Sequence, residues 1–222
     1  MNIGKFFVID GNDGSGKNTQ AQMLVHCLTK LNKKVEFLSF PRYNDTFFGK
    51  MLRQSLDGEY GDFVTLDPHL ASLPYALDRW VSRNLILNTI ASGGYVVCDR
   101  YVSANQIHQG GKIGDEKERF LFLTWLDELE YGQFRIPKPT VSIYLDVPLK
   151  ISLELISEKN RDTVENNKKY LANSHESARW LMKERPHQWI RVRCADQEGR
   201  VLRSREDIHA EVVTKLKEGG YV

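Results

Sequence analysis

Cysteine is scarce in this 222-residue chain, which has three. Cys27, Cys98 and Cys194 lie far apart and are odd in number, so they match neither a zinc-binding spacing nor a disulfide framework. Two of them end or interrupt apolar runs, and we therefore expect buried free thiols. A small fold held together by disulfides or by a cysteine-bound metal is excluded.

Long apolar runs and an excess of one charge are also lacking. No apolar run approaches the roughly 18 residues of a membrane span, and the sequence does not begin with a secretory leader pattern. Lys and Arg number 31 against 29 Asp and Glu, a net charge of +2. This balance favours neither nucleic acid nor a membrane as a partner. We therefore expect a cytoplasmic protein.

No repeat or low-complexity tract interrupts the chain, and strand patterns alternate with helical ones. With 41% hydrophobic residues, the chain is long enough for a single domain over residues 1–222 with a full core. The alternation predicts an α/β fold, a five-stranded parallel sheet flanked by helices. The expected strands are residues 6–10, 35–40, 95–98, 141–145 and 190–194. The expected helices are residues 19–31, 46–56, 73–91 (or from about 68), 115–132, 149–159, 168–183 and 205–217.

A glycine-rich turn after the first strand is the most informative feature of the sequence. Gly11, Gly16 and Lys17 match the phosphate-binding loop G-x-x-x-x-G-K, between an apolar strand and a helix-forming segment. The glycines let backbone N–H groups turn toward an anion, and the helix N-terminus adds partial positive charge. Lys17 would reach the outer phosphates of a nucleoside triphosphate. The predicted nucleotide-binding residues are Gly11, Asn12, Gly14, Ser15, Gly16, Lys17, Asn18 and Thr19.

One position of this loop departs from the usual pattern. Asn18 stands where Ser or Thr normally offers a hydroxyl to Mg²⁺. Its carboxamide oxygen is also a hard oxygen ligand, so Mg²⁺ could bind there directly or through water. The same departure leaves open a nucleotide-binding protein without turnover.

Charged side chains follow the second and third predicted strands, at the sheet edge where ligands bind. Asp99 is placed to hold a metal ion or its waters, and the alternative is an ion pair with a nearby Arg or Lys. Arg42, Arg79 and Arg100 could present forked donors to a phosphate. For Arg79, a solvated helix face or a pair with Asp78 is the alternative.

The arginines favour an acceptor that is itself a phosphate. A phosphate monoester is largely dianionic near neutral pH, so it needs no general base, and catalysis then rests on positioning and positive charge. An acceptor hydroxyl would instead need a base, for which Asp10 is the candidate.

A polar stretch between residues 155 and 169 joins two helical patterns. It could form a mobile lid, at about residues 157–168, that brings Lys159 and Arg161 over the transferring phosphoryl group. An ordinary solvated helix end is the alternative.

Taken together, these motifs resemble those of thymidylate kinases in order and spacing, over residues 6 to about 165. The motifs are residues 11–17, Phe-Pro-Arg-Tyr at 40–43, Leu-Asp-Arg at 77–79, Asp-Arg-Tyr at 99–101 and Ile-Pro-Lys-Pro at 136–139. The resemblance implies the nucleoside monophosphate kinase variant of the phosphate-loop fold, usually a homodimer. It also implies transfer of the γ-phosphate of ATP to dTMP with Mg²⁺.

The resemblance further implies roles for individual residues. Tyr75 would stack on thymine beside Phe40, while Arg79 and Asn105 would bind the edge of the base. The implied catalytic residues are Lys17, Asp13, Arg100, Asp99 and Arg161, with Asn18 and Asp99 near the metal. The implied substrate-binding residues are Phe40, Arg42, Tyr75, Arg79, Arg100, Asn105, His108 and Gln109.

Three positions besides Asn18 depart from the family pattern. Asp10 stands where the family usually has Glu, and His108 and Val164 stand where many members have Tyr. In the family those tyrosines help to exclude a ribose 2′-hydroxyl. Gln109 could partly take over their role. We therefore expect weaker rejection of ribose, and a phosphate-loop kinase for another nucleotide or nucleoside remains the alternative.

Overall fold

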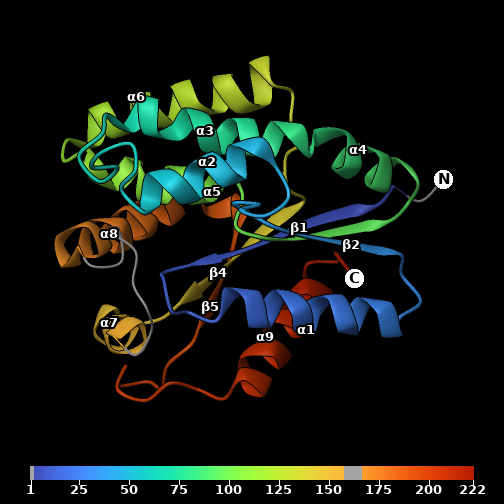
Figure 1. Cartoon of the computed structure of the whole chain (residues 1–222). Helices are drawn as coiled ribbons and strands as arrows, with labels where there is room; N and C mark the ends of the chain where they lie inside the picture. The colour runs from blue at the N-terminus through green and yellow to red at the C-terminus, as the bar shows by residue number, and fades with distance from the viewer. Residues whose placement is uncertain (1–2, 158–166) are drawn as a thin grey trace.

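The computed structural model describes residues 3–157 and 167–222, and five parallel strands lie at its centre (Figure 1). The sheet order is β2-β3-β1-β4-β5. The strands are β1 (Lys5–Gly11), β2 (Val35–Ser39), β3 (Tyr95–Asp99), β4 (Val141–Asp146) and β5 (Trp189–Arg193). The predicted α/β fold with a five-stranded parallel sheet is confirmed, and each strand begins and ends within one residue of its predicted range.

Helices cover both faces of the sheet, which explains why the central strands are apolar throughout. Alternate residues of β1 face opposite ways: Phe7 and Ile9 pack with α1 and α9, whereas Phe6 and Val8 pack with α5, α6 and α8. Figure 1 shows α1 and α9 on one side of the sheet and α3, α4 and α6 on the other. The helices are α1 (Lys17–Lys30), α2 (Phe47–Leu56), α3 (Pro68–Val81), α4 (Arg83–Ala91), α5 (Val102–His108), α6 (Glu116–Asp127), α7 (Leu149–Ser157), α8 (Lys168–Glu184) and α9 (Arg205–Glu218).

The helix expected over residues 73–91 differs from the prediction. It begins at Pro68, the alternative start, because the Asp67 side chain accepts hydrogen bonds from the backbone N–H groups of His69 and Leu70. It is also divided at Ser82 into α3 and α4. The Ser82 side chain is buried and accepts a hydrogen bond from Arg42 at 3.0 Å, a contact that local sequence does not reveal.

Two further elements depart from the predicted ones. The short helix α5 was not predicted, and the helix expected over residues 115–132 changes after Asp127 into a π-helical turn, η2 (Glu128–Gln133). Cys98 and Cys194 are buried free thiols as expected, while Cys27 is half-buried. Every helix in the described ranges is too short or too polar to span a membrane.

Candidate active site

The phosphate loop joins β1 to α1 and closes on the side chain of Lys17. The Lys17 ammonium donates to the carbonyl oxygens of Gly11 and Asn12 at 3.1 and 2.7 Å. Gly14 and Gly16 have φ angles of 76° and 80°, in the left-handed region that favours glycine. A Cβ at Gly14 would also lie 3.1 Å from the Leu155 Cβ of α7. The loop therefore needs its glycines both to turn and to lie close to α7.

The N-terminus of α1 offers donors to an anion. Its first residues have no side-chain cap, and Asn18 and Thr19 are exposed. The buried hydroxyl of Ser15 has no hydrogen-bond partner among the described residues. Burial and the neighbouring Arg100 lower the pKa of Lys17 to about 8. A bound phosphate would favour the charged ammonium and supply an acceptor for these donors.

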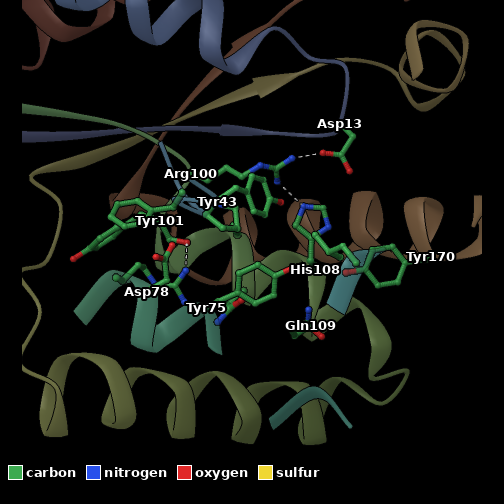
Figure 2. Close-up of a pocket in the computed structure, with 15 residues that line it drawn as sticks. Asp13, Tyr43, Tyr75, Asp78, Arg100, Tyr101, His108, Gln109 and Tyr170 are labelled. Atoms are coloured by element: carbon green, nitrogen blue, oxygen red, sulfur yellow. Dashed lines mark hydrogen bonds and ion pairs between the residues drawn. The ribbon is translucent and has the colours of Figure 1, made fainter. Parts of the chain in front are cut away.

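Arg100 lies at the centre of a charged network beside the loop. In Figure 2 its guanidinium extends between Asp13 and His108, with which it forms an ion pair and a 2.9 Å hydrogen bond respectively. Burial lowers the pKa of His108 to about 4, with Arg100 and Lys17 adding to the effect. His108 is therefore neutral at pH 7 and accepts from Arg100. Although burial opposes it, Arg100 and Lys17 hold the pKa of the Asp13 carboxyl well below its usual range.

The two acids at the ends of β1 and β3 are held differently. Asp10 accepts from the Gly11 backbone N–H at 2.8 Å and from the Ser103 hydroxyl at 2.7 Å, so both its oxygens are engaged. Asp99 accepts a long 3.4 Å bond from Ser39 through Oδ2, whereas its buried Oδ1 has no hydrogen-bond partner. In the described part of the chain Asp99 forms no ion pair, contrary to the alternative for this residue.

Asp99 and Asn18 can contribute to a magnesium site but do not complete one. Within residues 3–157 and 167–222 no three His, Cys, Asp or Glu side chains cluster as a metal site. Mg²⁺ is usually held in proteins by one or two carboxylates together with substrate phosphates and waters. The unpartnered Oδ1 of Asp99 fits that kind of incomplete donor set.

A cavity of about 140 Å³ opens on the other side of Arg100. Figure 2 shows Tyr43, Tyr75, Tyr101, His108 and Tyr170 around it. The structure brings Asp13 and seven of the eight predicted substrate-binding residues to its wall: Phe40, Tyr75, Arg79, Arg100, Asn105, His108 and Gln109. The buried side-chain oxygen Oε1 of Gln109 has no hydrogen-bond partner among the described residues, which fits a polar ligand.

Arg42 is the predicted substrate residue that does not line this cavity. Its guanidinium donates to Ser82 at 3.0 Å and to Asp45 at 3.4 Å. Its backbone N–H donates to Asp78, which also accepts from the Thr46 hydroxyl. Arg42 therefore holds the turn after β2 against α3 in this structure.

Arg79 is neither solvated nor paired with its neighbour Asp78, so both alternatives for it are wrong. It is 2% exposed and forms a two-pronged ion pair with Glu130, from Nε and Nη2, at 2.6 Å each. Its Nη1 donates to the Tyr101 carbonyl at 3.2 Å. Glu130 was missed because it is 51 residues away in sequence, in a run that reads as a solvated helix end.

Tyr170 was also missed. Its ring stacks on His108 with centroids 5.9 Å apart and planes 11° from parallel. It lies in the first turn of α8, and no local pattern indicates that α8 reaches the cavity. Lys159, Arg161 and Val164 lie outside the described residues, so their roles stay predictions.

Asn12 anchors the beginning of the phosphate loop to strand β4. Its Oδ1 accepts from the Tyr144 hydroxyl at 2.8 Å, and its Nδ2 donates to the Val147 carbonyl at 3.3 Å and lies against His175. These contacts occupy the side-chain amide of Asn12, so Asn12 would bind a ligand through its backbone.

Known proteins resemble the chain over nearly its whole length. The family model described as Thymidylate kinase matches residues 9–204. A probable thymidylate kinase of Pyrococcus horikoshii is 31% identical over 219 residues, 96% of each chain. The thymidylate kinase of Plasmodium falciparum is 30% identical over 223 residues, 96% of this chain and 91% of its own. A solved thymidylate kinase structure from Candida albicans has a TM-score of 0.78 at 19% identity, covering 99% and 93% of the two chains.

Proposed function

The chain belongs to the thymidylate kinase family, and from that premise we propose how its site phosphorylates dTMP. The reaction transfers the γ-phosphate of ATP to dTMP and gives dTDP and ADP. One observation supports most strongly the division of the site into a donor region and an acceptor region. Arg100 lies between the phosphate loop and an aromatic cavity. A guanidinium in that place can hold an acceptor phosphate facing a donor phosphate.

The phosphate loop binds the donor. Backbone N–H groups of residues 11–16, the N-terminus of α1 and the Lys17 ammonium surround the outer phosphates of ATP. When dTMP binds, its phosphate takes the place of Asp13 or His108 as a hydrogen-bond partner of Arg100. Because that phosphate is already anionic, the site needs positive charge and alignment rather than a base.

Asp99 and Asn18 would hold Mg²⁺ near the donor phosphates. When bound, the ion neutralises charge on the phosphates of ATP. The buried, unpartnered Oδ1 of Asp99 would accept from a water of the ion or bind it directly, and the exposed carboxamide of Asn18 lies at the start of α1.

The cavity takes the nucleoside of dTMP. Phe40 and Tyr75 supply apolar ring surface for thymine, while Arg79, Asn105 and Gln109 supply polar groups at its edge. A nucleoside hydroxyl as acceptor is less well served, because both oxygens of Asp10 are engaged and Asp10 does not line the cavity.

The proposal also includes four features that follow from the length and composition of the chain and from the family resemblance. They are a single domain over residues 1–222, a homodimer, a cytoplasmic location, and a lid at about residues 157–168 that carries Lys159 and Arg161. Residues 158–166 lie outside the described part of the chain.

The reaction is tested by incubating the protein with ATP, Mg²⁺ and either dTMP or thymidine, and quantifying nucleotides by chromatography. We expect ADP and dTDP in equal amounts from dTMP and no product from thymidine. The Lys17→Ala variant is the blank, since it lacks the ammonium in the phosphate loop. Phosphorylation of thymidine but not of dTMP would overturn the proposal.

A further inference from the structure

A buried histidine of α8 contacts the phosphate loop and takes no part in the chemistry proposed above. His175 is 7% exposed, and its Nδ1 lies against the side-chain amide of Asn12, the residue that follows Gly11 in the loop. The two residues are 163 positions apart in sequence. Burying polar side chains costs free energy unless they are hydrogen-bonded. The contact therefore gives the loop a support from outside the strand and the helix that it joins.

The other partners of Asn12 assign the donor and the acceptor in this contact. The Val147 carbonyl can only accept, so the atom of Asn12 that lies 3.3 Å from it and also against His175 is the nitrogen Nδ2. The oxygen Oδ1 accepts from the Tyr144 hydroxyl at 2.8 Å. Burial, with Arg179 adding to it, lowers the pKa of His175, so the ring is neutral at pH 7. Its Nδ1 then accepts the second N–H of Nδ2, and both donors and the oxygen of the amide are paired.

The backbone of Asn12 holds the ammonium of Lys17. Its carbonyl oxygen accepts from the Lys17 Nζ at 2.7 Å and from the Ser15 N–H at 3.1 Å. The first bond orients the lysine that would reach the donor phosphates, and the second closes the turn of the loop. Because the side chain and the carbonyl belong to one residue, a displacement of the Asn12 amide also shifts this carbonyl. The contact with His175 therefore bears on where the loop presents its ammonium and its N–H groups.

Helix α8 is itself fixed closely enough to act as a support. It packs against the 3₁₀ turn η1 (Gly110–Lys112), where a Cβ at Gly111 would lie 3.1 Å from the Ser174 Cα. Tyr170 of the same helix stacks on His108 in the wall of the cavity. One helix thus contacts the phosphate loop through one side chain and the acceptor cavity through another.

We propose that His175 is a positioning residue for the phosphate donor, which acts through Asn12 to hold the phosphate loop in the geometry that binds ATP. The proposal rests on the proposed function, which places the phosphates of ATP in this loop. Without an acceptor at Nδ1, one N–H of Asn12 is buried and unpaired, and the amide is stabilised by turning to another acceptor. The loop must then be reordered when the nucleotide binds, which weakens binding. The acceptor cavity keeps all its residues, so the affinity for dTMP should not change.

Three variants separate this role from packing. His175→Leu fills a similar volume but offers no acceptor, so it breaks the contact. His175→Asn retains an acceptor, because the Oδ1 of asparagine stands at about the place of the Nδ1 of histidine on the side chain. His209→Leu is the matched control, since His209 of α9 is half-buried across the sheet from α8 and its Nδ1 has no hydrogen-bond partner among the described residues.

The test measures the dissociation constants of ADP, in the presence of Mg²⁺, and of dTMP by isothermal titration calorimetry. We expect the constant for ADP to rise about tenfold in His175→Leu, the scale of one buried N–H left unpaired. It should stay within about twofold of the wild type in His175→Asn and His209→Leu, as should the constant for dTMP in all three variants. The KM for ATP should rise with the constant for ADP, while the KM for dTMP stays the same.

Three results would overturn the proposal. They are an unchanged affinity for ADP in folded His175→Leu, an equal loss in His175→Asn or His209→Leu, and an equal loss of affinity for dTMP. The first would show that the loop keeps its geometry without the contact. The second would show that the acceptor atom is not what matters, and the third that the substitution disturbs the whole site.

A double-mutant cycle shows whether His175 acts through Asn12. In Asn12→Ala the amide is absent, so adding His175→Leu should weaken ADP binding by no more than about twofold further. A full further loss in that background would overturn the proposal, because His175 would then act by another route. Asn12→Ala also serves if His175→Leu does not fold. We expect it to weaken ADP binding about tenfold or more, and an unchanged affinity would overturn the proposal.

Binding of ADP needs no phosphoryl transfer, so the inference and the proposed function can fail separately. A protein that shows the expected pattern for ADP but does not phosphorylate dTMP supports the inference and contradicts the proposed function. If His175→Leu phosphorylates dTMP with the KM for ATP of the wild type, the inference is overturned and the proposed function is not.

Discussion

At the scale of single residues, Arg100 is where the charges of the site converge. It adopts a φ of 64°, and it is bonded to Asp13 and His108 at once. We expect Arg100→Ala to lower kcat/KM for dTMP by about 30- to 1,000-fold, on the scale of losing a charge-assisted contact in the transition state. Steady-state kinetics measure this, with Arg83→Ala, at a half-buried arginine outside the cavity, as control. An unchanged kcat/KM for dTMP would remove Arg100 from the acceptor site.

His108 should make folding stability depend on pH. Its pKa is about 4 in the folded protein, mainly through burial, against an ordinary value of 6.5. Between these values the unfolded chain binds more protons, so the free energy of unfolding contributed by His108 rises with pH from 4 to 6.5 and is lost below. We expect His108→Gln to remove up to about 3 kcal/mol of this rise.

Denaturant unfolding at pH 4.5 and pH 7 measures the effect. The exposed His26→Gln is the control, since acids that titrate in the same range then cancel between the variants. If the free energy of unfolding of His108→Gln changes between the two pH values as much as that of the wild type, the imidazole of His108 is not held neutral in the folded protein.

His108 should also influence the choice of sugar. It is smaller than the Tyr that many family members have, and Val164 cannot form a hydrogen bond. A pocket rejects an extra group strongly only through a clash or an unpaired polar atom. We expect His108→Tyr to increase the preference for dUMP over UMP, as measured by kcat/KM. If the wild type already rejects UMP as strongly, another residue sets sugar choice, and Tyr170, stacked on His108, is the first to examine.

At the scale of elements, α2 fixes the turn that carries Phe40 into the cavity. The Thr46 hydroxyl accepts from the Gly49 N–H at 2.8 Å and donates to Asp78 of α3. A Cβ at Gly49 would lie 2.0 Å from the Arg42 carbonyl oxygen, so helix and turn would have to separate.

Gly49→Ala therefore tests this close approach. We expect it to lower the free energy of unfolding by about 1–3 kcal/mol and to raise the KM for dTMP. Gly114→Ala is the control, because a Cβ there meets nothing within 4 Å. Equal stability and KM in the two variants would show that α2 does not position the turn.

The elements also show what the sequence can predict. Buried parallel strands are short apolar runs, so β1 and β4 were located within one residue. The break at Ser82 and the π-helical turn at Glu130 coincide with contacts to residues 40 and 51 positions away, Arg42 and Arg79, which no local pattern reveals. For the same reason, the motifs predicted most of the cavity wall but neither Tyr170 nor the carboxylate behind Arg79.

At the scale of the whole molecule, strand order brings the site together. β2, β3 and β1 are adjacent and parallel, so the loops that follow them lie side by side at one edge. Those loops carry Phe40, Arg100 and Lys17, which come from three distant parts of the sequence. The sheet thus places an anion-binding loop, a cation and an aromatic cavity in a row.

Phosphorylation of dTMP in this site is tested by comparing kcat/KM for dTMP, dUMP, dCMP, dAMP and dGMP, with ATP as donor in the presence of Mg²⁺. We expect the highest value for dTMP, with dUMP next, because both bases complement Arg79 and Asn105 and thymine fills more of the cavity. ADP release with dTMP no faster than in Lys17→Ala, or a higher kcat/KM for dCMP or a purine nucleotide, would contradict it.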